Sequence, residues 1–115
     1  MRAGMAVVAL AVLLAAPVAA KDWTRLDGAE VRRALSERKL QYEDGSWQTF
    51  ANDGGTSMQR GRYMRGRWEV RGDSYCALWP PSQDWACYRV ERNARQQSLR
   101  FTAQDGQVVV GIYVD

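Results

Sequence analysis

The sequence predicts a mainly β protein with one N-terminal helix, arranged as an antiparallel meander that forms a small barrel or a strongly bent sheet. Three observations lead to this prediction: a capped amphipathic segment near the start, closely spaced turn signals in the rest of the chain, and two cysteines that flank a proline-containing turn. Short connections favour antiparallel neighbours. Closure is preferred because it hides strand edges, and an open sheet with the helix across one face is the alternative.

The helix is expected to begin within Leu26 to Val31. Asp27 is the predicted N-cap, and Glu30 three residues later completes a capping box, while Leu26 and Val31 have the spacing of a hydrophobic staple. The pattern continues through Glu37, which makes about three turns. Its apolar face is narrow, so the helix must pack on other elements. That face consists of Val31, Ala34 and Leu35.

Turn signals divide the chain after Leu40 into short segments with the alternating pattern of strands. The signals are Asp44-Gly45, Asp53-Gly54-Gly55, Gly72-Asp73, Pro80-Pro81, Asn93-Ala94 and Asp105-Gly106. We expect strands over Ser46 to Ala51, Thr56 to Met64, Arg67 to Arg71, Ser74 to Trp79, Trp85 to Glu91, Ser98 to Thr102 and Val108 to Val114. Seven or eight strands in this order form a meander.

An aliphatic run sets the first twenty residues apart from the rest. Arg2 precedes the run from Met5 to Ala16, and small residues follow it. This pattern is typical of a signal peptide, and the run is too short to span a bilayer comfortably. We therefore expect residues 1–20 to be a cleaved signal peptide and residues 21–115 to be one periplasmic or secreted domain without a membrane span. A retained N-terminal anchor is the alternative.

Export would place Cys76 and Cys87 where thiols oxidise, so we expect a disulfide between them. If the two cysteines face each other across an antiparallel pair, Ala77 faces Ala86, Leu78 faces Trp85, and Trp79 faces Asp84. The four residues from Pro80 to Gln83 then form the turn, which suits prolines that cannot continue a strand. Closing a ring of this size stabilises a fold by about 3 kcal/mol in the chain-entropy model.

Several motifs resemble a family of small exported bacterial proteins known as domain of unknown function number 995. They are Phe50-Ala51-Asn52-Asp53-Gly54-Gly55-Thr56, Gly66-Arg67-Trp68, Tyr75-Cys76, Trp79 and Cys87-Tyr88, together with the helix start from Leu26 to Val31. The resemblance covers most of the chain after residue 20. It implies a periplasmic setting and one sheet-rich domain, and it transfers no catalytic residue, substrate or cofactor.

The register of the cysteine hairpin separates two apolar faces. Tyr75, Trp79, Ala86, Tyr88 and Val90 share one side, and Cys76, Leu78, Trp85 and Cys87 share the other. One face must belong to the core. The other packs on the helix, on another chain or on a ligand that stacks on aromatic rings. Among these aromatic residues we expect Trp79, beside the prolines, to be exposed.

Arginines gather in the segment that follows the Asp-Gly-Gly turn. Arg60 and Arg62 share one side of the expected strand, and Arg67 and Arg71 share a side of the next, with Glu69 between them. They could form a basic ribbon that grips carboxylates or phosphates. The alternative is a solvated outer face on which arginines keep the sheet soluble.

Composition argues against several classes of activity. The chain has 115 residues and no histidine, so histidine-dependent triads and imidazole metal ligands are excluded. Glu43, Asp44, Asp53, Glu69 and Asp84 are the acids that could serve a glycosidase, but nothing in the sequence pairs them. We expect no enzymatic activity, no cofactor and no metal site. Loss of Arg2 leaves a net charge of +2, too weak to indicate nucleic-acid binding.

Two functional hypotheses follow from these features. In the first, the protein is an exported non-enzymatic binding module that holds a small anionic or aromatic ligand, or another cell-envelope protein. Its expected binding residues are Arg60, Arg62, Arg67, Arg71, Tyr75, Trp79 and Tyr88. In the second, it is a structural or stress-tolerance protein of the periplasm that associates with its own copies through Val108 to Val114 or through the aromatic face.

Overall fold

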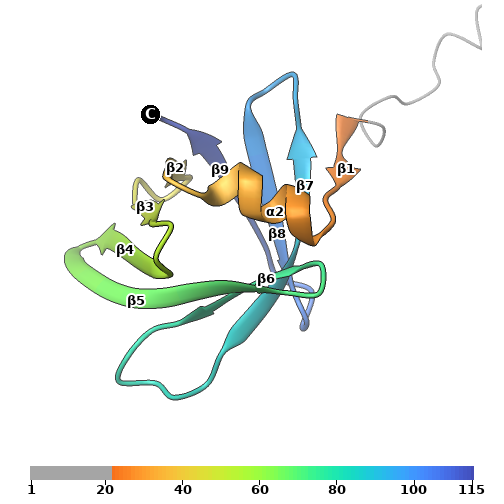
Figure 1. Ribbon diagram of the computed structural model, residues 1–115. Helices are drawn as coiled ribbons and strands as arrows, with labels where there is room; N and C mark the ends of the chain where they lie inside the picture. Colours follow the sequence, from red (N-terminus) through yellow and green to blue (C-terminus); the bar gives the residue numbers. More distant parts are fainter. Residues whose placement is uncertain (1–21) are drawn as a thin grey trace, which may run out of the picture.

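The computed structural model describes residues 22–115, and the expected signal peptide lies outside this range (Figure 1). The described elements are helix α2 (Gly28–Leu35) and strands β1 (Thr24–Arg25), β2 (Arg38–Tyr42), β3 (Trp47–Phe50), β4 (Gly55–Arg60), β5 (Arg62–Arg71), β6 (Ser74–Leu78), β7 (Ala86–Asn93), β8 (Ser98–Ala103) and β9 (Val108–Tyr113). None of the helical residues in this range forms a segment long and apolar enough to cross a bilayer. The prediction of a mainly β fold with one helix is confirmed.

Strands β2 to β9 form a closed antiparallel barrel, in which each strand pairs with its neighbours in sequence. The last seam joins β9 to β2 and places Leu40 opposite Tyr113 and Tyr42 opposite Gly111. The short strand β1 is an addition that pairs with the end of β7, beyond the part of β7 that pairs with β6. The barrel, rather than the open sheet, is therefore the correct form of the predicted meander.

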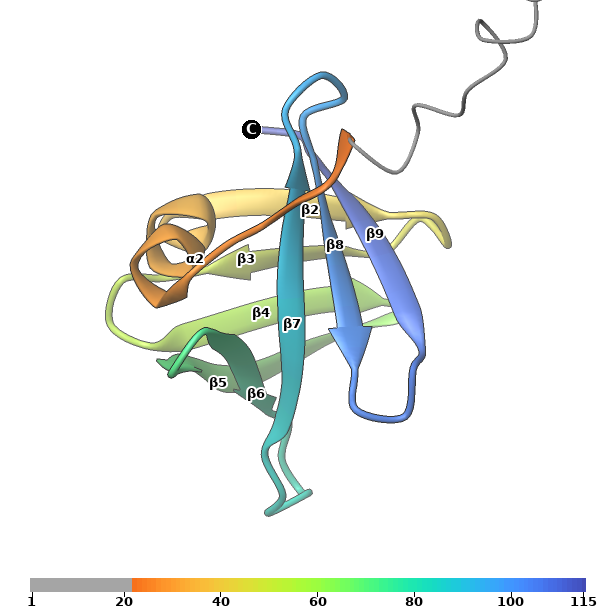
Figure 2. The same ribbon diagram turned by 90° about the vertical axis from the view of Figure 1, so that its right-hand side faces the viewer.

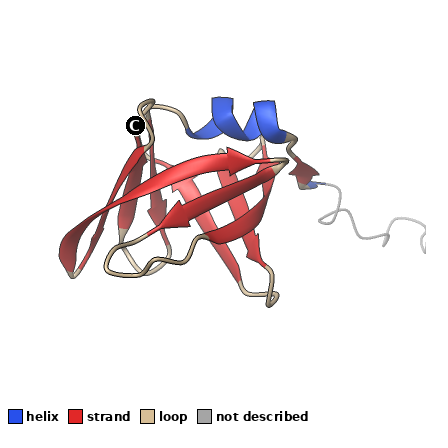
Figure 3. Ribbon diagram, turned by 60° about the horizontal axis from the view of Figure 1, so that its bottom comes forward, coloured by secondary structure: helices blue, strands red, loops and turns tan. Residues whose placement is uncertain are grey.

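Helix α2 covers one end of the barrel (Figures 2 and 3). Its capping box is formed as predicted, because the Asp27 carboxylate accepts from Glu30 N and the Glu30 carboxylate accepts from Asp27 N. The first helical amide, Gly28 N, donates to Asp73 in the β5–β6 turn at 2.8 Å. At the other end of the helix, the hydroxyl of Tyr113 in β9 donates to the carbonyl of Ala34 at 2.7 Å. The predicted apolar face is buried.

The described structure corrects some element boundaries. The helix ends at Leu35, and strand β2 follows almost at once, because Glu37 adopts a positive φ of 60° and donates its N–H to Phe50 O. No glycine or proline marks this change of direction, so the strand was not predicted. The expected strand from Thr56 to Met64 is interrupted at Gly61, whose φ of 72° forms the β4–β5 turn.

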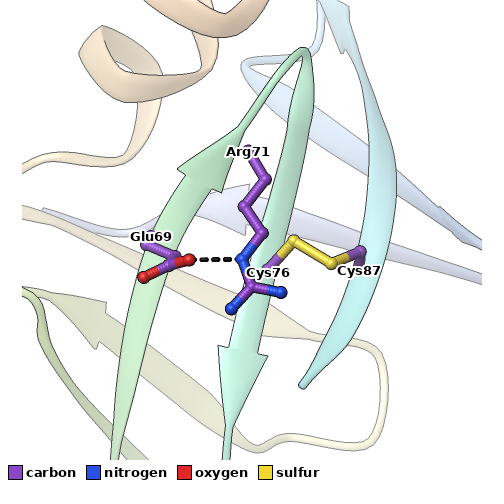
Figure 4. The surroundings of a disulfide bond; sticks show 4 residues. All are labelled: Glu69, Arg71, Cys76 and Cys87. Atoms are coloured by element: carbon purple, nitrogen blue, oxygen red, sulfur yellow. Dashed lines mark hydrogen bonds and ion pairs between the residues drawn. A yellow bond between two sulfur atoms is a disulfide. The ribbon is translucent and has the colours of Figure 1, made fainter.

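The disulfide between Cys76 and Cys87 is present with the predicted cross-strand register (Figure 4). Ala77 lies opposite Ala86 as expected, but the ladder ends at that pair. The connection consequently contains residues 79–85 and is longer than the predicted four-residue turn. Glu69 of β5 pairs with Cys76, so this carboxylate and the disulfide lie on the same face of the wall.

The contact between α2 and the β5–β6 turn leaves no room for a side chain at Gly28. A Cβ atom built there would lie 2.2 Å from the carbonyl oxygen of Gly72. We predict that Gly28→Ala lowers the free energy of unfolding in urea by about 1–3 kcal/mol. Ala29→Ser, at the adjacent exposed position, serves as the control and should change it by no more than about 0.5 kcal/mol. Equal stabilities of the two variants would contradict this description of the helix contact.

Candidate functional site

A cavity of about 90 Å³ lies inside the barrel at the end away from α2, and it opens to solvent. The residues that line it come from seven of the barrel strands and from the β6–β7 connection. They are Tyr42, Gln48, Met58, Arg60, Tyr75, Trp79, Tyr88, Phe101 and Val109. The helix covers one end of β2 and β3, and the β2–β3 turn lies at the opposite end (Figure 2). We call the end of the barrel opposite the helix, where the cavity opens, the barrel mouth.

Aromatic rings form most of the wall of the barrel mouth. Tyr75 stacks on Tyr88, with ring centroids 5.7 Å apart and planes inclined by 27°. Phe101 meets Tyr75 edge-to-face at 5.4 Å, and it also contacts Tyr42 in this way at 6.4 Å. Such offset and edge-to-face pairs hold the rings in fixed orientations. The predicted aromatic face is therefore the inner wall of the barrel.

A buried amide crosses the floor of the barrel mouth. The side chain of Gln48 is 2% exposed and accepts a hydrogen bond from the Tyr42 hydroxyl at 2.6 Å. Its nitrogen donates to Thr56 Oγ1 and to Tyr75 Oη, each at 2.9 Å. The Thr56 hydroxyl in turn donates to the carbonyl of Thr49 at 2.7 Å. A buried amide of this kind is stable only when its polar atoms are paired.

Burial keeps the floor tyrosines neutral. Desolvation raises the pKa of Tyr42 well above its usual value, and Tyr75 and Tyr88 add to this rise while the charge of Arg60 opposes it. Desolvation also raises the pKa of Tyr75, against a smaller lowering by the hydrogen bond from Gln48. Both hydroxyl groups therefore keep their protons at pH values at which an exposed tyrosine has begun to lose its own.

Arg60 is the cationic residue at the rim of the barrel mouth. Its guanidinium lies 3.4 Å from the carboxylate of Asp44 in the β2–β3 turn, and both side chains are more than half exposed. The pKa of Asp44 is lowered mainly by its hydrogen bonds with Ser46, and Arg60 contributes less. An ion pair this exposed is weak. Arg60 can therefore exchange Asp44 for an anionic ligand at little cost.

The four arginines predicted to bind do not form one ribbon. Arg60 and Arg62 face each other across β4 and β5, on the same side as the pair of Met58 and Met64 that points into the barrel. Arg67, which lies opposite Gly55, is an odd number of residues from Arg62 in β5 and so points to the outer face. Arg71 shares the side of Arg67. The two pairs therefore point to opposite faces of the wall. The prediction of a continuous ribbon is wrong because the turn at Gly61 leaves Arg60 and Arg62 on the inner face.

Arg71 is engaged on the outer wall of the barrel. It forms an ion pair with Glu69, beside the disulfide (Figure 4). Its guanidinium also lies over the ring of Trp85, 4.7 Å from the centroid. Trp85 thus packs on an arginine at the outer face, which is the side of the hairpin, shared with Cys76 and Cys87, on which it was predicted to lie.

Trp79 is half-buried, and the prediction that it is exposed is wrong. It packs against the core and lines the barrel mouth. A Cβ atom built at Gly66 would lie 2.8 Å from Trp79 Cε3, so the ring rests on the bare backbone of β5. The exposed aromatic residue in the described range is Tyr63, with 54% of its surface accessible.

Apolar side chains emerge from the outer face of β9. Val108, Ile112 and Val114 are exposed at 54%, 52% and 44%. Val110, Ile112 and Val114 line a pocket of about 410 Å³ together with Ser98, whose buried hydroxyl has no hydrogen-bond partner in the described structure. Residues 108–110 pair with β8, but the described pairing with β2 starts only at Gly111. Part of the predicted strand edge therefore stays open.

Tyr75, Trp79, Tyr88 and Arg60 were predicted as site residues and meet at the barrel mouth, whereas Arg62, Arg67 and Arg71 do not line it. Sequence reasoning missed Tyr42, Gln48, Met58, Phe101 and Val109. A signal for Gln48 exists, because it stands between Ser46 and Phe50 on the apolar side of its strand. A polar residue at an inward position indicates an internal hydrogen-bond network.

The raised pKa of Tyr75 produces a defined dependence of stability on pH. The unfolded chain loses the phenolic proton near pH 10, whereas the folded protein keeps it, so the free energy of unfolding falls as the pH rises above about 10. The slope should approach about 1.4 kcal/mol per pH unit for each tyrosine that stays protonated. Urea unfolding between pH 8 and pH 11.5 should show a smaller slope in Tyr75→Phe than in the native protein. Tyr63→Phe, at an exposed position, should keep the native slope, and an unchanged slope in Tyr75→Phe would contradict the prediction.

Comparisons with known proteins leave the family of this chain open. A scan against protein-family models, a search of curated proteins and a search of solved structures each found no match. The resemblance to the family called domain of unknown function number 995 therefore stays a prediction.

Proposed function

We propose that the protein is an exported, non-enzymatic binding module that holds a small anionic or aromatic ligand at the barrel mouth. The observation that carries this proposal is the cavity whose walls are aromatic and whose rim carries Arg60. Pockets with mostly apolar walls and a few fixed polar groups are the usual form of small-molecule sites. The interior of a small eight-stranded barrel is one place where such a site can occur.

The shape and charge of the barrel mouth restrict what it can hold. Its volume of about 90 Å³ is smaller than the roughly 150 Å³ that encloses a benzene molecule in an engineered lysozyme. A ligand can therefore insert one end between the rings while the rest stays in solvent. Arg60 at the rim favours a negative charge on that outer part. Lipids and other ligands that need full enclosure do not fit.

Export is part of the proposal. The Cys76–Cys87 disulfide, the signal-peptide pattern of residues 1–20 and the resemblance to exported proteins support a periplasmic or secreted location. A ligand or partner would then belong to the cell envelope or its surroundings. An exposed side chain of another envelope protein could supply the same aromatic or acidic group.

The proposal predicts that small aromatic acids bind at the barrel mouth and that Arg60 contributes to their affinity. Benzoate titrated into the ¹⁵N-labelled protein should shift the amide signals of Tyr88 and Phe101. Arg60→Gln should weaken binding about three- to tenfold, as expected for the loss of one charge-assisted contact. Arg65→Gln removes an arginine from the outer face and should leave the affinity unchanged. A panel of aromatic acids that produces no shifts at the barrel mouth would contradict the proposal.

The second candidate function, a structural protein that associates with its own copies, is favoured by the apolar outer face of β9. Exposed apolar residues that are contiguous often mark an interface. The partly unpaired edge at residues 108–110 could add a strand from a second copy. Two such edges are identical and can pair about a twofold axis.

Sedimentation velocity at increasing concentration tests this second function. We predict that a dimer, if formed through β9, is abolished by the double substitution Val108→Glu and Ile112→Glu, because each copy would bury two charges in the interface. Tyr63→Ser removes an equally exposed apolar residue from β5 and should leave association unchanged. A native protein that stays monomeric at millimolar concentration would exclude this function.

A further inference from the structure

The floor of the barrel mouth has one more hydrogen-bond donor than the protein uses. Four hydrogen bonds connect Tyr42, Gln48, Thr56, Tyr75 and the carbonyl of Thr49. The three hydroxyls and the amide supply five hydrogens, since each hydroxyl has one and the amide has two. The hydrogen that remains belongs to Tyr75, whose oxygen accepts from Gln48 but which donates to no acceptor in the described structure.

The orientation of the Gln48 amide is fixed by its neighbours. Thr56 gives its single hydrogen to the carbonyl of Thr49, so it can only accept from Gln48. The amide nitrogen must therefore face Thr56, and its oxygen must face Tyr42. In the reverse orientation Thr56 would meet an acceptor with no hydrogen left to give, and one bond would be lost. The amide cannot be turned to accept from Tyr75 without the loss of another hydrogen bond, so the hydroxyl hydrogen of Tyr75 stays without an acceptor.

Tyr42 has the complementary surplus. Its hydroxyl hydrogen goes to Gln48 at 2.6 Å, and its oxygen accepts no hydrogen bond from the described residues. Both tyrosines line the cavity. The floor thus offers a free O–H from Tyr75 and a free acceptor oxygen from Tyr42. A single hydroxyl group can accept from the first and donate to the second.

We propose that the barrel mouth selects small aromatic acids that carry a neutral hydroxyl group at the end opposite the acid. The hydroxyl and the edge of the ring that carries it enter between the aromatic walls toward Tyr75 and Tyr42, and the rest of the ring and the acid group stay outside near Arg60. This inference rests on the proposed function and specifies its ligand class. An ionised group at the inner end is disfavoured, because burial there is costly and Arg60 lies at the rim.

The experiment compares three ligands of known chemistry at pH 7: 4-hydroxybenzoate, 4-methylbenzoate and benzoate. The methyl group matches the hydroxyl in size but forms no hydrogen bond. We expect 4-hydroxybenzoate to bind about tenfold more tightly than 4-methylbenzoate, with amide shifts at Tyr88 and Phe101 for both. Tyr75→Phe should bring the ratio of the two affinities close to one and leave the affinity for 4-methylbenzoate unchanged. Tyr63→Phe should retain the native ratio.

The outcomes separate the inference from the function on which it rests. If all three acids bind at the barrel mouth with equal affinity, the hydroxyl groups of Tyr75 and Tyr42 do not select the ligand, because a water molecule satisfies them equally well. The inference is then overturned while the proposed function stands. If none of them shifts signals at the barrel mouth, both are overturned. A preference for the hydroxyl that survives in Tyr75→Phe also overturns the inference. The comparison of ligands on the native protein needs no substitution, so it decides the question even if Tyr75→Phe is unstable.

Discussion

The seam between β2 and β9 turns the meander into a barrel, and the rest of the structure depends on it. Only three residue pairs form this seam, but several contacts reinforce it. Asp115 binds Arg38 through its side chain at 2.9 Å and accepts from Lys39 N, and Val114 N donates to Lys39 O. Gly111 faces Tyr42, where a Cβ atom would lie 3.0 Å from the tyrosine ring. The absence of a side chain at Gly111 lets Tyr42 turn inward and reach Gln48, so the seam also shapes the floor of the barrel mouth.

The two ends of the barrel have different roles. At one end, α2 fills the opening with Val31 and Leu35, both fully buried, and hydrogen bonds fix the helix to the β5–β6 turn and to β9. At the other end no element among residues 22–115 covers the aromatic wall, and the polar groups on the floor are held by neighbours that are themselves buried. For the proposed binding function this arrangement has an advantage, because groups that are already ordered would lose little entropy on meeting a ligand.

Local signals in the sequence were sufficient for much of the fold. The capping box of Asp27 and Glu30, the disulfide and its register, and most strand positions depend on neighbours a few residues apart, where spacing carries the information. Strand β2 was missed because Glu37 makes a turn without a glycine.

At the site, Tyr75, Trp79 and Tyr88 were placed correctly on one face, but which face is the interior depends on the closure of the barrel. The arginine ribbon failed for a related reason, since a turn at Gly61 rather than after Met64 changes the position of Arg60 relative to Arg67. In the Gln48 network, Tyr42 and Thr56 belong to the adjacent strands, but the bond to Tyr75 joins residues 27 apart in sequence, and no local spacing rule predicts it.

The seam also determines the order in which the chain can assemble. Every other pairing within the barrel joins strands that follow each other in sequence, whereas the seam brings Leu40 to Tyr113 across nearly the whole domain. The cost in chain entropy of that contact is lowest after the intervening hairpins have formed, because they shorten the effective loop. Closure should therefore be the last step of folding. Until it occurs, β9 exposes a valine-rich strand with a free edge, so the time spent before closure sets the exposure of the nascent chain to aggregation.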